Sequence, residues 1–224
     1  MAEAMLRHPY PTVEKGGDLA WGGNQGWLKA PLAQKYGCGV VAATDLLLYL
    51  HRYGEGWGSG YFRDLPEGPI PWEIYDFYAD RLRKRYFPLI PPFGLNTLLL
   101  AGGLNRYFRE YQLPLRAGWR LAAGAFWQRA ETMLRRDIPV ILCIGPNFPF
   151  FWQKHQLPLY TQGAEGSFLA EGGTQAHFVT MAGMEGAWLT VSSWGRRYHI
   201  RREEYEGYCR KHSCPLYCGM AEIR

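Results

Sequence analysis

Residues 34–53 read QKYGCGVVAATDLLLYLHRY, and this stretch decides the fold class more than any other. A cysteine between two glycines opens it, and a mostly apolar run follows as far as Tyr53. The length and apolar character of the run predict a buried helix over 38–53. Cys38 would lie in the first turn, where unpaired amides and the helix dipole lower a thiol pKa and favour thiolate. Cys38 is therefore a candidate nucleophile. The alternative is a small buried residue at a helix start.

The elements around this helix change type along the chain. Periodic apolar residues predict helices at Trp72–Tyr86, Leu95–Tyr111 (interrupted by Gly102-Gly103) and Ala123–Arg136. Patterns typical of strands then occupy 138–144, 176–184, 187–193, 197–200 and 216–223, with a short helix at 201–211. We expect an irregular arm over 1–35 and a long aromatic loop over 147–174. Helices followed by mostly antiparallel strands predict an α+β fold.

We expect this fold to form one domain over 1–224. Its helical lobe, 1–120, would carry Cys38 on the nucleophile helix. A twisted antiparallel sheet in 121–224 would carry His177, and the helical lobe would pack against it. A cleft between the two would hold the substrate.

Composition narrows the class of protein. The 224 residues are 47% hydrophobic and 20% charged, with a net charge of +5, which is typical of a compact globular protein. The densest basic cluster, Arg81–Arg85, shares its segment with acidic residues, so we expect a solvated helix face and no nucleic-acid partner.

No signal peptide and no apolar run near the ~20 residues of a membrane span is visible, which predicts a soluble, cytoplasmic protein. Five cysteines, an odd number, predict reduced thiols.

His177 is the candidate base. It lies at the start of the apolar segment Ala176-His177-Phe178-Val179, after the long loop, where a base would be presented to a cleft. A histidine on such a strand is otherwise a satisfied core residue. Downstream, Val191-Ser192-Ser193-Trp194-Gly195 ends the next strand and can supply a group that orients the imidazole. Upstream, the Gln34 side-chain amide can join the Cys38 amide as an oxyanion hole.

Taken in order, these residues carry a family resemblance. The run Gln34…Tyr36-Gly37-Cys38-Gly39, followed by an apolar helix, resembles the nucleophile region of papain-like cysteine peptidases. Segment 127–144 is similar to the one that precedes the histidine strand in that superfamily. Ala176-His177-Phe178-Val179, and then Ser192-Ser193-Trp194-Gly195, resemble the histidine strand and the signature after it. The set covers most of 34–205 and looks closest to the bacteriocin-leader (double-glycine) peptidases.

The resemblance implies a cysteine peptidase or amidase that forms an acyl-enzyme on a peptide, acyl or amide substrate. It implies Cys38 as nucleophile, His177 as general base and acid, and Gln34 as oxyanion donor. Two departures stand out. The orienting position, Asn or Asp in the family, is Ser192 here, and Gln34 is closer to Cys38 than the family has it. A hydroxyl cannot stabilise imidazolium as a carboxylate does, so a catalytically degenerate binding module remains an alternative. Acyl transfer by the same Cys–His pair is another.

A third class of function rests on the C-terminal end of the chain. Cys209, His212, Cys214 and Cys218 are soft ligands within ten residues, but paired C-x2-C knuckles are missing. A small interaction domain built on a structural zinc site is the alternative there. We expect no metal and no cofactor.

Overall fold

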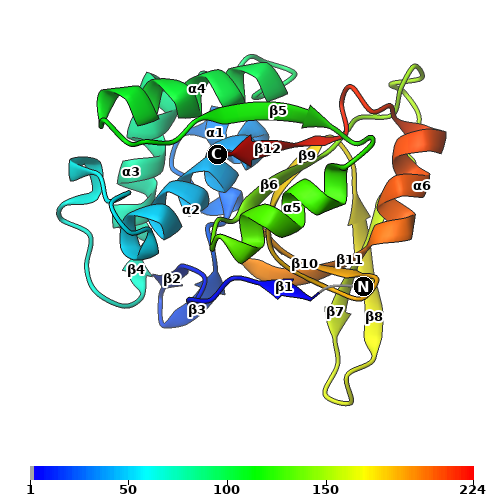
Figure 1. Ribbon diagram of the computed structural model, residues 1–224, viewed down its shortest axis with the longest axis horizontal. Coiled ribbons are helices and arrows are strands. Elements are labelled where there is room, and N and C mark those ends of the chain that lie inside the picture. Colours follow the sequence, from blue (N-terminus) through cyan, green and yellow to red (C-terminus); the bar gives the residue numbers. More distant parts are fainter. Residues whose placement is uncertain (1–2) are drawn as a thin grey trace.

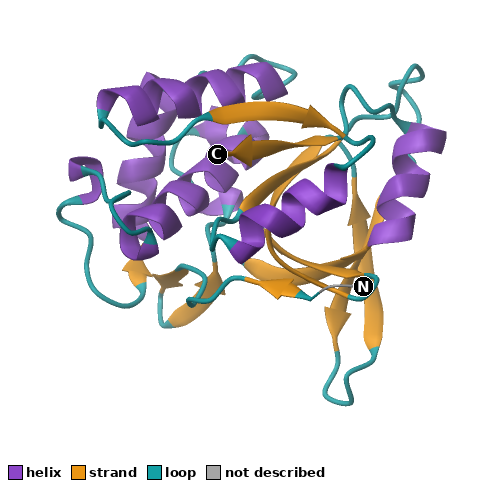
Figure 2. Ribbon diagram, in the orientation of Figure 1, coloured by secondary structure: helices purple, strands orange, loops and turns teal. Residues whose placement is uncertain are grey.

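The computed structural model describes residues 3–224 and has a mixed α+β architecture with a large antiparallel sheet (Figures 1 and 2). The strand order of this sheet is β5-β12-β6-β9-β10-β11-β7-β8, and β1 also pairs with β9. Its strands are β1 (Ala4–Met5), β5 (Ala117–Leu121), β6 (Val140–Ile144), β7 (Leu157–Gln162), β8 (Phe168–Thr174), β9 (His177–Glu185), β10 (Trp188–Ser193), β11 (Arg196–Arg201) and β12 (Gly219–Ile223).

A second, small sheet has the strand order β3-β2-β4. It consists of β2 (Thr12–Lys15), β3 (Asp18–Trp21) and β4 (Ile70–Pro71). The helices are α1 (Pro31–Tyr36), α2 (Cys38–Tyr53), α3 (Trp72–Arg85), α4 (Thr97–Glu110), α5 (Phe126–Arg135) and α6 (Arg202–His212), with 3-10 turns η1 (Gln25–Trp27) and η2 (Gly60–Phe62). None of the helices between residues 3 and 224 has both the length and the apolar character that crossing a bilayer requires.

Helix α2 is the centre of the fold. Every residue from Gly39 to Leu50 is buried, so other parts of the protein cover the helix on all sides. This is why the sequence of the helix has no polar face. One side packs on β9, which itself lies between β6 and β10 in the large sheet. The helix begins at Cys38 and ends at Tyr53, and the amide of the next residue, Gly54, closes the last turn on the carbonyl of Leu50. The start of α2 is thereby fixed against the sheet.

Several expected elements need correction. The arm over 1–35 is not irregular, because it contains β1, β2, β3, η1 and α1. The segment expected to be one long loop is instead a shorter loop at 145–156, followed along the chain by the β7–β8 hairpin. Helix α4 runs through Gly102-Gly103 without interruption. These segments were missed because short strands and glycines carry little periodic signal and are fixed by pairing with distant strands.

The large sheet takes strands from both ends of the chain. β5 (Ala117–Leu121) lies at the end of the helical half and pairs with β12, and β1, near the N-terminus, pairs with β9. The helical half therefore also contributes two strands to the sheet, in addition to the small sheet that it contains.

Candidate functional site

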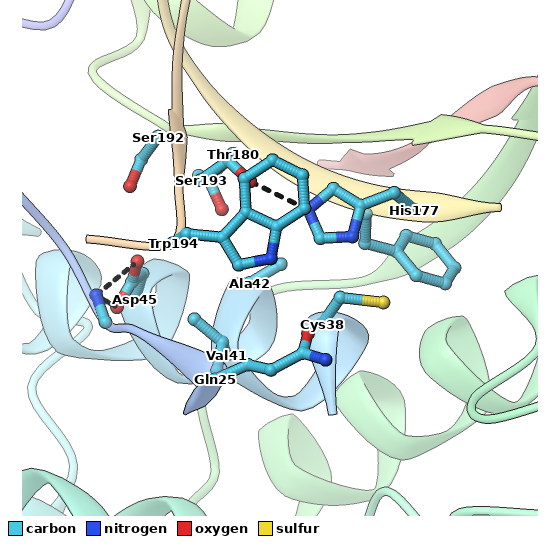
Figure 3. Close-up of a pocket in the computed structure, with 12 residues that line it drawn as sticks. Gln25, Cys38, Val41, Ala42, Asp45, His177, Thr180, Ser192, Ser193 and Trp194 are labelled. Atoms are coloured by element: carbon cyan, nitrogen blue, oxygen red, sulfur yellow. Dashed lines mark hydrogen bonds between the residues drawn. The ribbon is translucent and has the colours of Figure 1, made fainter. Parts of the chain in front are cut away.

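Cys38 and His177 come from opposite halves of the sequence and line the same cavity (Figure 3). Cys38 is the first residue of α2, and His177 is the first residue of β9. The cavity is narrow, with about 10 Å³ of free volume, which is room for about one water. Its other lining residues are Gly23, Gln25, Val41, Ala42, Asp45, Phe178, Thr180, Ser192, Ser193 and Trp194.

The electrostatic setting of Cys38 differs from the expectation for a helix N-terminus. Burial raises the pKa of the Cys38 thiol above its usual value. The backbone amides of Phe178, Gly39 and Cys38 itself face the sulfur and lower the pKa, but they offset the rise only in part. The expected lowered thiol pKa is therefore wrong for this structure. Because desolvation outweighs the amides, the thiol is protonated at neutral pH.

His177 is buried and neutral. Its side chain is 7% exposed, and burial lowers the pKa of the imidazole to about 4. Its Nε2 lies 2.7 Å from Oγ of Ser193 in a hydrogen bond, and in Figure 3 the other ring nitrogen lies on the side of Cys38. Among the hydrogen bonds of residues 3–224, none joins the imidazole to the Cys38 sulfur. Such contacts often form only with substrate present.

Trp194 covers the imidazole. The two rings are stacked, with centroids 4.3 Å apart and planes 18° from parallel. Trp194 and Gly195 form the two-residue turn between β10 and β11, and both have positive φ, 49° and 74°. A bulky residue with φ > 0 is strained, and Ala176, immediately before His177, has φ 48°. Strained residues on both sides of the imidazole are typical of a site whose geometry is enforced by its surroundings.

The structure corrects the prediction for Ser192. Its Oγ donates a hydrogen bond to the carbonyl of Trp21 at 2.7 Å, and Ser193 is the residue that contacts His177. Ser192 lies opposite Thr180 in the β9–β10 ladder, so strand alternation puts Ser193 on the side of the imidazole. A register shift between Thr190 and Val191 sets this pairing. The shift was not visible in the sequence.

Gln34 is also not where it was predicted. Its side chain is exposed on α1 and does not line the cavity. Its backbone carbonyl instead accepts a hydrogen bond of 2.8 Å from Nε2 of Gln25, which does line the cavity. Gln25 Oε1 is buried without a partner among the described residues. Gln25 is the side-chain amide that the site offers beside Cys38, and sequence reasoning missed it.

Asp45 is a second residue that sequence reasoning missed. Its carboxylate lies in the wall of the cavity, 1% exposed, and accepts hydrogen bonds from Tyr10 (3.0 Å), Tyr75 (2.8 Å) and the amide of Gly23 (3.1 Å). Burial raises its pKa to about 7, against these donors. A single acidic residue inside an apolar helix was the signal that could have found it.

The hydrogen bond from the amide of Gly23 to Asp45 attaches the segment that carries Gln25 to the wall of the cavity. A Cβ at Gly22 would collide with Asp45 and Ser192, and one at Gly23 would collide with the ring of Tyr75. Gly22 has φ 83°, which glycine adopts without strain. The Gly22-Gly23 pair thus allows the close approach that brings Gln25 to the start of α2.

The C-terminal cysteines form a separate group. Cys209 and Cys218 are buried, Cys214 is partly exposed, and His212 stacks on His155 with ring centroids 4.0 Å apart. All five cysteines are free thiols. Over residues 3–224, no set of three or more His, Cys, Asp or Glu side chains is arranged to hold a metal ion.

The site therefore brings together a thiol at a helix start, a neutral imidazole and two kinds of amide donor in one narrow cavity. This arrangement can support nucleophilic attack by sulfur on an acyl carbon. No protein-family model matches the chain, and neither curated proteins nor solved structures gave a match.

Proposed function

We propose that this protein is a cysteine-dependent hydrolase with a papain-like arrangement, which cleaves a peptide or amide bond through an acyl-enzyme on Cys38. The observation that carries the proposal is that Cys38 and His177 begin a helix and a strand that pack together, so that both side chains line one cavity. The strained residues around His177 add support.

The reaction begins with the thiol in its neutral form. Sγ of Cys38 attacks the carbonyl carbon of the substrate while its proton passes to Nδ1 of His177. The carbonyl oxygen becomes an oxyanion, which the amide of Cys38 and the second N–H of Gln25 Nε2 would stabilise, since the first N–H donates to Gln34. His177 then gives the proton to the leaving amine, and the C–N bond breaks to leave a thioester on Sγ.

Water completes the cycle. It attacks the thioester carbonyl as His177 takes a proton from it, and the proton returns to Sγ as the acid product leaves. With Nε2–H donating to Ser193, the lone pair of Nδ1 is available for both proton transfers. Ser193 is thus a positioning residue, which holds the imidazole ring in this orientation.

A catalytically degenerate binding module is the second candidate, and two observations favour it. The resting pair is neutral, with the thiol pKa raised and the imidazole pKa near 4, so no thiolate is stored for attack. The imidazole is oriented by a hydroxyl, which gives imidazolium less stabilisation than a carboxylate would. Such a protein would keep the cavity and lose turnover.

Burst kinetics separates the two candidates. With an activated ester, the hydrolase should release one equivalent of leaving group per chain before steady state. Cys38→Ala should abolish the burst. Cys214→Ala is the matched control, because Cys214 is the other partly exposed thiol and should leave the burst unchanged. If wild type and Cys214→Ala give no burst with esters or peptides, the hydrolase proposal fails and the binding module replaces it.

A further inference from the structure

A group of large apolar side chains is exposed in the loop between β6 and β7 and in the loop between α6 and β12. Trp152 is 74% exposed, Leu216 63% and Phe151 59%, and Phe148 and Phe150 are 40% and 48% exposed. We call these five residues the loop patch. Scattered apolar residues on a surface are ordinary, but a cluster of large ones is typical of a binding surface.

The two loops are held together, so the loop patch is a single surface. The amide of Phe148 donates to the carbonyl of His212 at 3.0 Å, and the rings of Phe148 and Tyr217 have centroids 5.5 Å apart. Within the first loop, Phe148 contacts Phe151 and Phe150 contacts Trp152, at 5.7 and 5.3 Å between centroids. In Figure 1 both loops lie at the C-terminal end of α6, at one corner of the molecule.

Within the two loops that carry the loop patch, the charged side chains have one sign. Over 145–164 and 207–221 the chain contains Lys154, Arg210 and Lys211 and no aspartate or glutamate. All three basic residues are exposed, and none takes part in the ion pairs of residues 3–224. Of the acidic residues of α6, Glu203 and Glu204 lie in its first turn. Glu206, one turn before Arg210, accepts a hydrogen bond from Trp127 and pairs with Arg202.

From this combination we propose that the loop patch docks the protein onto the surface of an anionic lipid bilayer. Trp and Phe side chains partition into the boundary between headgroups and acyl chains. Basic side chains beside them are attracted to anionic headgroups, by about a factor of five in affinity for each. A protein partner would need apolar groups of its own and acidic groups placed opposite three separate cations, whereas an anionic bilayer presents both over its whole surface.

Docking here is peripheral and independent of the reaction at Cys38. Nothing in it requires a spanning helix. The cavity shares no lining residue with the loop patch, although Asn147, at the start of the first loop, bonds to Gln175 two residues before His177.

Vesicle co-sedimentation tests the proposal with the full chain. We expect binding to vesicles of phosphatidylcholine with about 30% phosphatidylglycerol, much weaker binding to pure phosphatidylcholine, and a decrease as salt is raised. Trp152→Ser should weaken binding at least about fivefold, and the pair Lys154→Glu with Lys211→Glu at least about tenfold. Circular dichroism would check that each variant is folded.

Matched controls come from other exposed side chains of the same types. Phe93→Ser, at 83% exposure in the turn between α3 and α4, and Arg109→Glu on α4 should leave vesicle binding unchanged. Equal loss in the controls, or no binding to either vesicle, would overturn the proposal. A concentration-dependent dimer that Trp152→Ser dissociates, without vesicle binding, would assign the loop patch to a second copy of the chain instead.

Discussion

The desolvation of Cys38 and His177 sets the protonation state from which a reaction can start. With the thiol pKa raised, alkylation of Cys38 by iodoacetamide should increase about tenfold per pH unit from pH 7 to 9, because only thiolate reacts. Acylation by an activated ester needs neutral imidazole and should fall only as pH drops through about 4. Mass spectrometry of labelled peptides measures the first rate, with Cys214 as internal reference. A rate for Cys38 that is already level at pH 7 would indicate a stored thiolate–imidazolium pair.

Variants of the two adjacent serines distinguish an effect on the orientation of the base from an effect on packing. Ser193→Ala removes the hydrogen bond to Nε2 and should lower the acylation rate about tenfold, because the ring is no longer held in one orientation. Ser192→Ala removes a bond to the carbonyl of Trp21 and should change the rate less than about twofold. Stopped-flow burst rates measure both. The reverse order of effects would restore Ser192 as the orienting residue.

Asp45 should make stability depend on pH in a direction opposite to that of most carboxylates. Its folded pKa, about 7, is above the unfolded value, so the folded state binds the proton more tightly and stability decreases as pH rises toward 7. Asp45→Asn removes this titration. The free energy of unfolding of the variant, relative to wild type, should therefore rise by about 2–3 kcal/mol from pH 5 to pH 7. Urea unfolding at the two pH values measures it, and parallel profiles would show that Asp45 titrates below pH 5.

At the scale of elements, adjacent glycines in α4 provide a matched pair. A Cβ at Gly103 would collide with the backbone of Tyr86 and the ring of Phe87, whereas a Cβ at Gly102 meets nothing. Gly103→Ala should therefore destabilise the protein by roughly 1–3 kcal/mol. Gly102→Ala should stabilise it by about 0.5–1 kcal/mol through helix propensity. Thermal melts of both variants measure these two changes in stability. Equal shifts would mean that α4 is not packed against the segment at Tyr86-Phe87.

The elements also show what a sequence of this kind can predict. The helix over 38–53 and the strands around His177 were predictable because long apolar runs leave few alternatives. The β7–β8 hairpin was not, since β8 is largely exposed and contains Gly172-Gly173. Within the site, Cys38 and His177 were found from their local motifs. Gln25 and Ser193 depended on a glycine turn and a register shift, which only the folded chain determines.

At the scale of the whole molecule, distant segments meet to build the cavity. Asp137 joins several of these segments through hydrogen bonds. It accepts hydrogen bonds from the amide of Arg7 (2.7 Å) and from Tyr49 (2.6 Å) and lies 2.6 Å from the ring of His8. The N-terminal arm, α2 and the turn before β6 are thus joined at one carboxylate. The positions of Cys38 and His177 consequently depend on the complete fold.

The measurement that tests the central claim most directly is the location of the acyl group after a rapid acid quench of the protein with an activated ester. We expect peptide mapping by mass spectrometry to find one acyl group per chain, on Cys38, in wild type. His177→Ala should slow its appearance by a factor of about 100 or more, because the base is removed. An acyl group on another cysteine, none at all, or equal rates in wild type and His177→Ala would contradict the account.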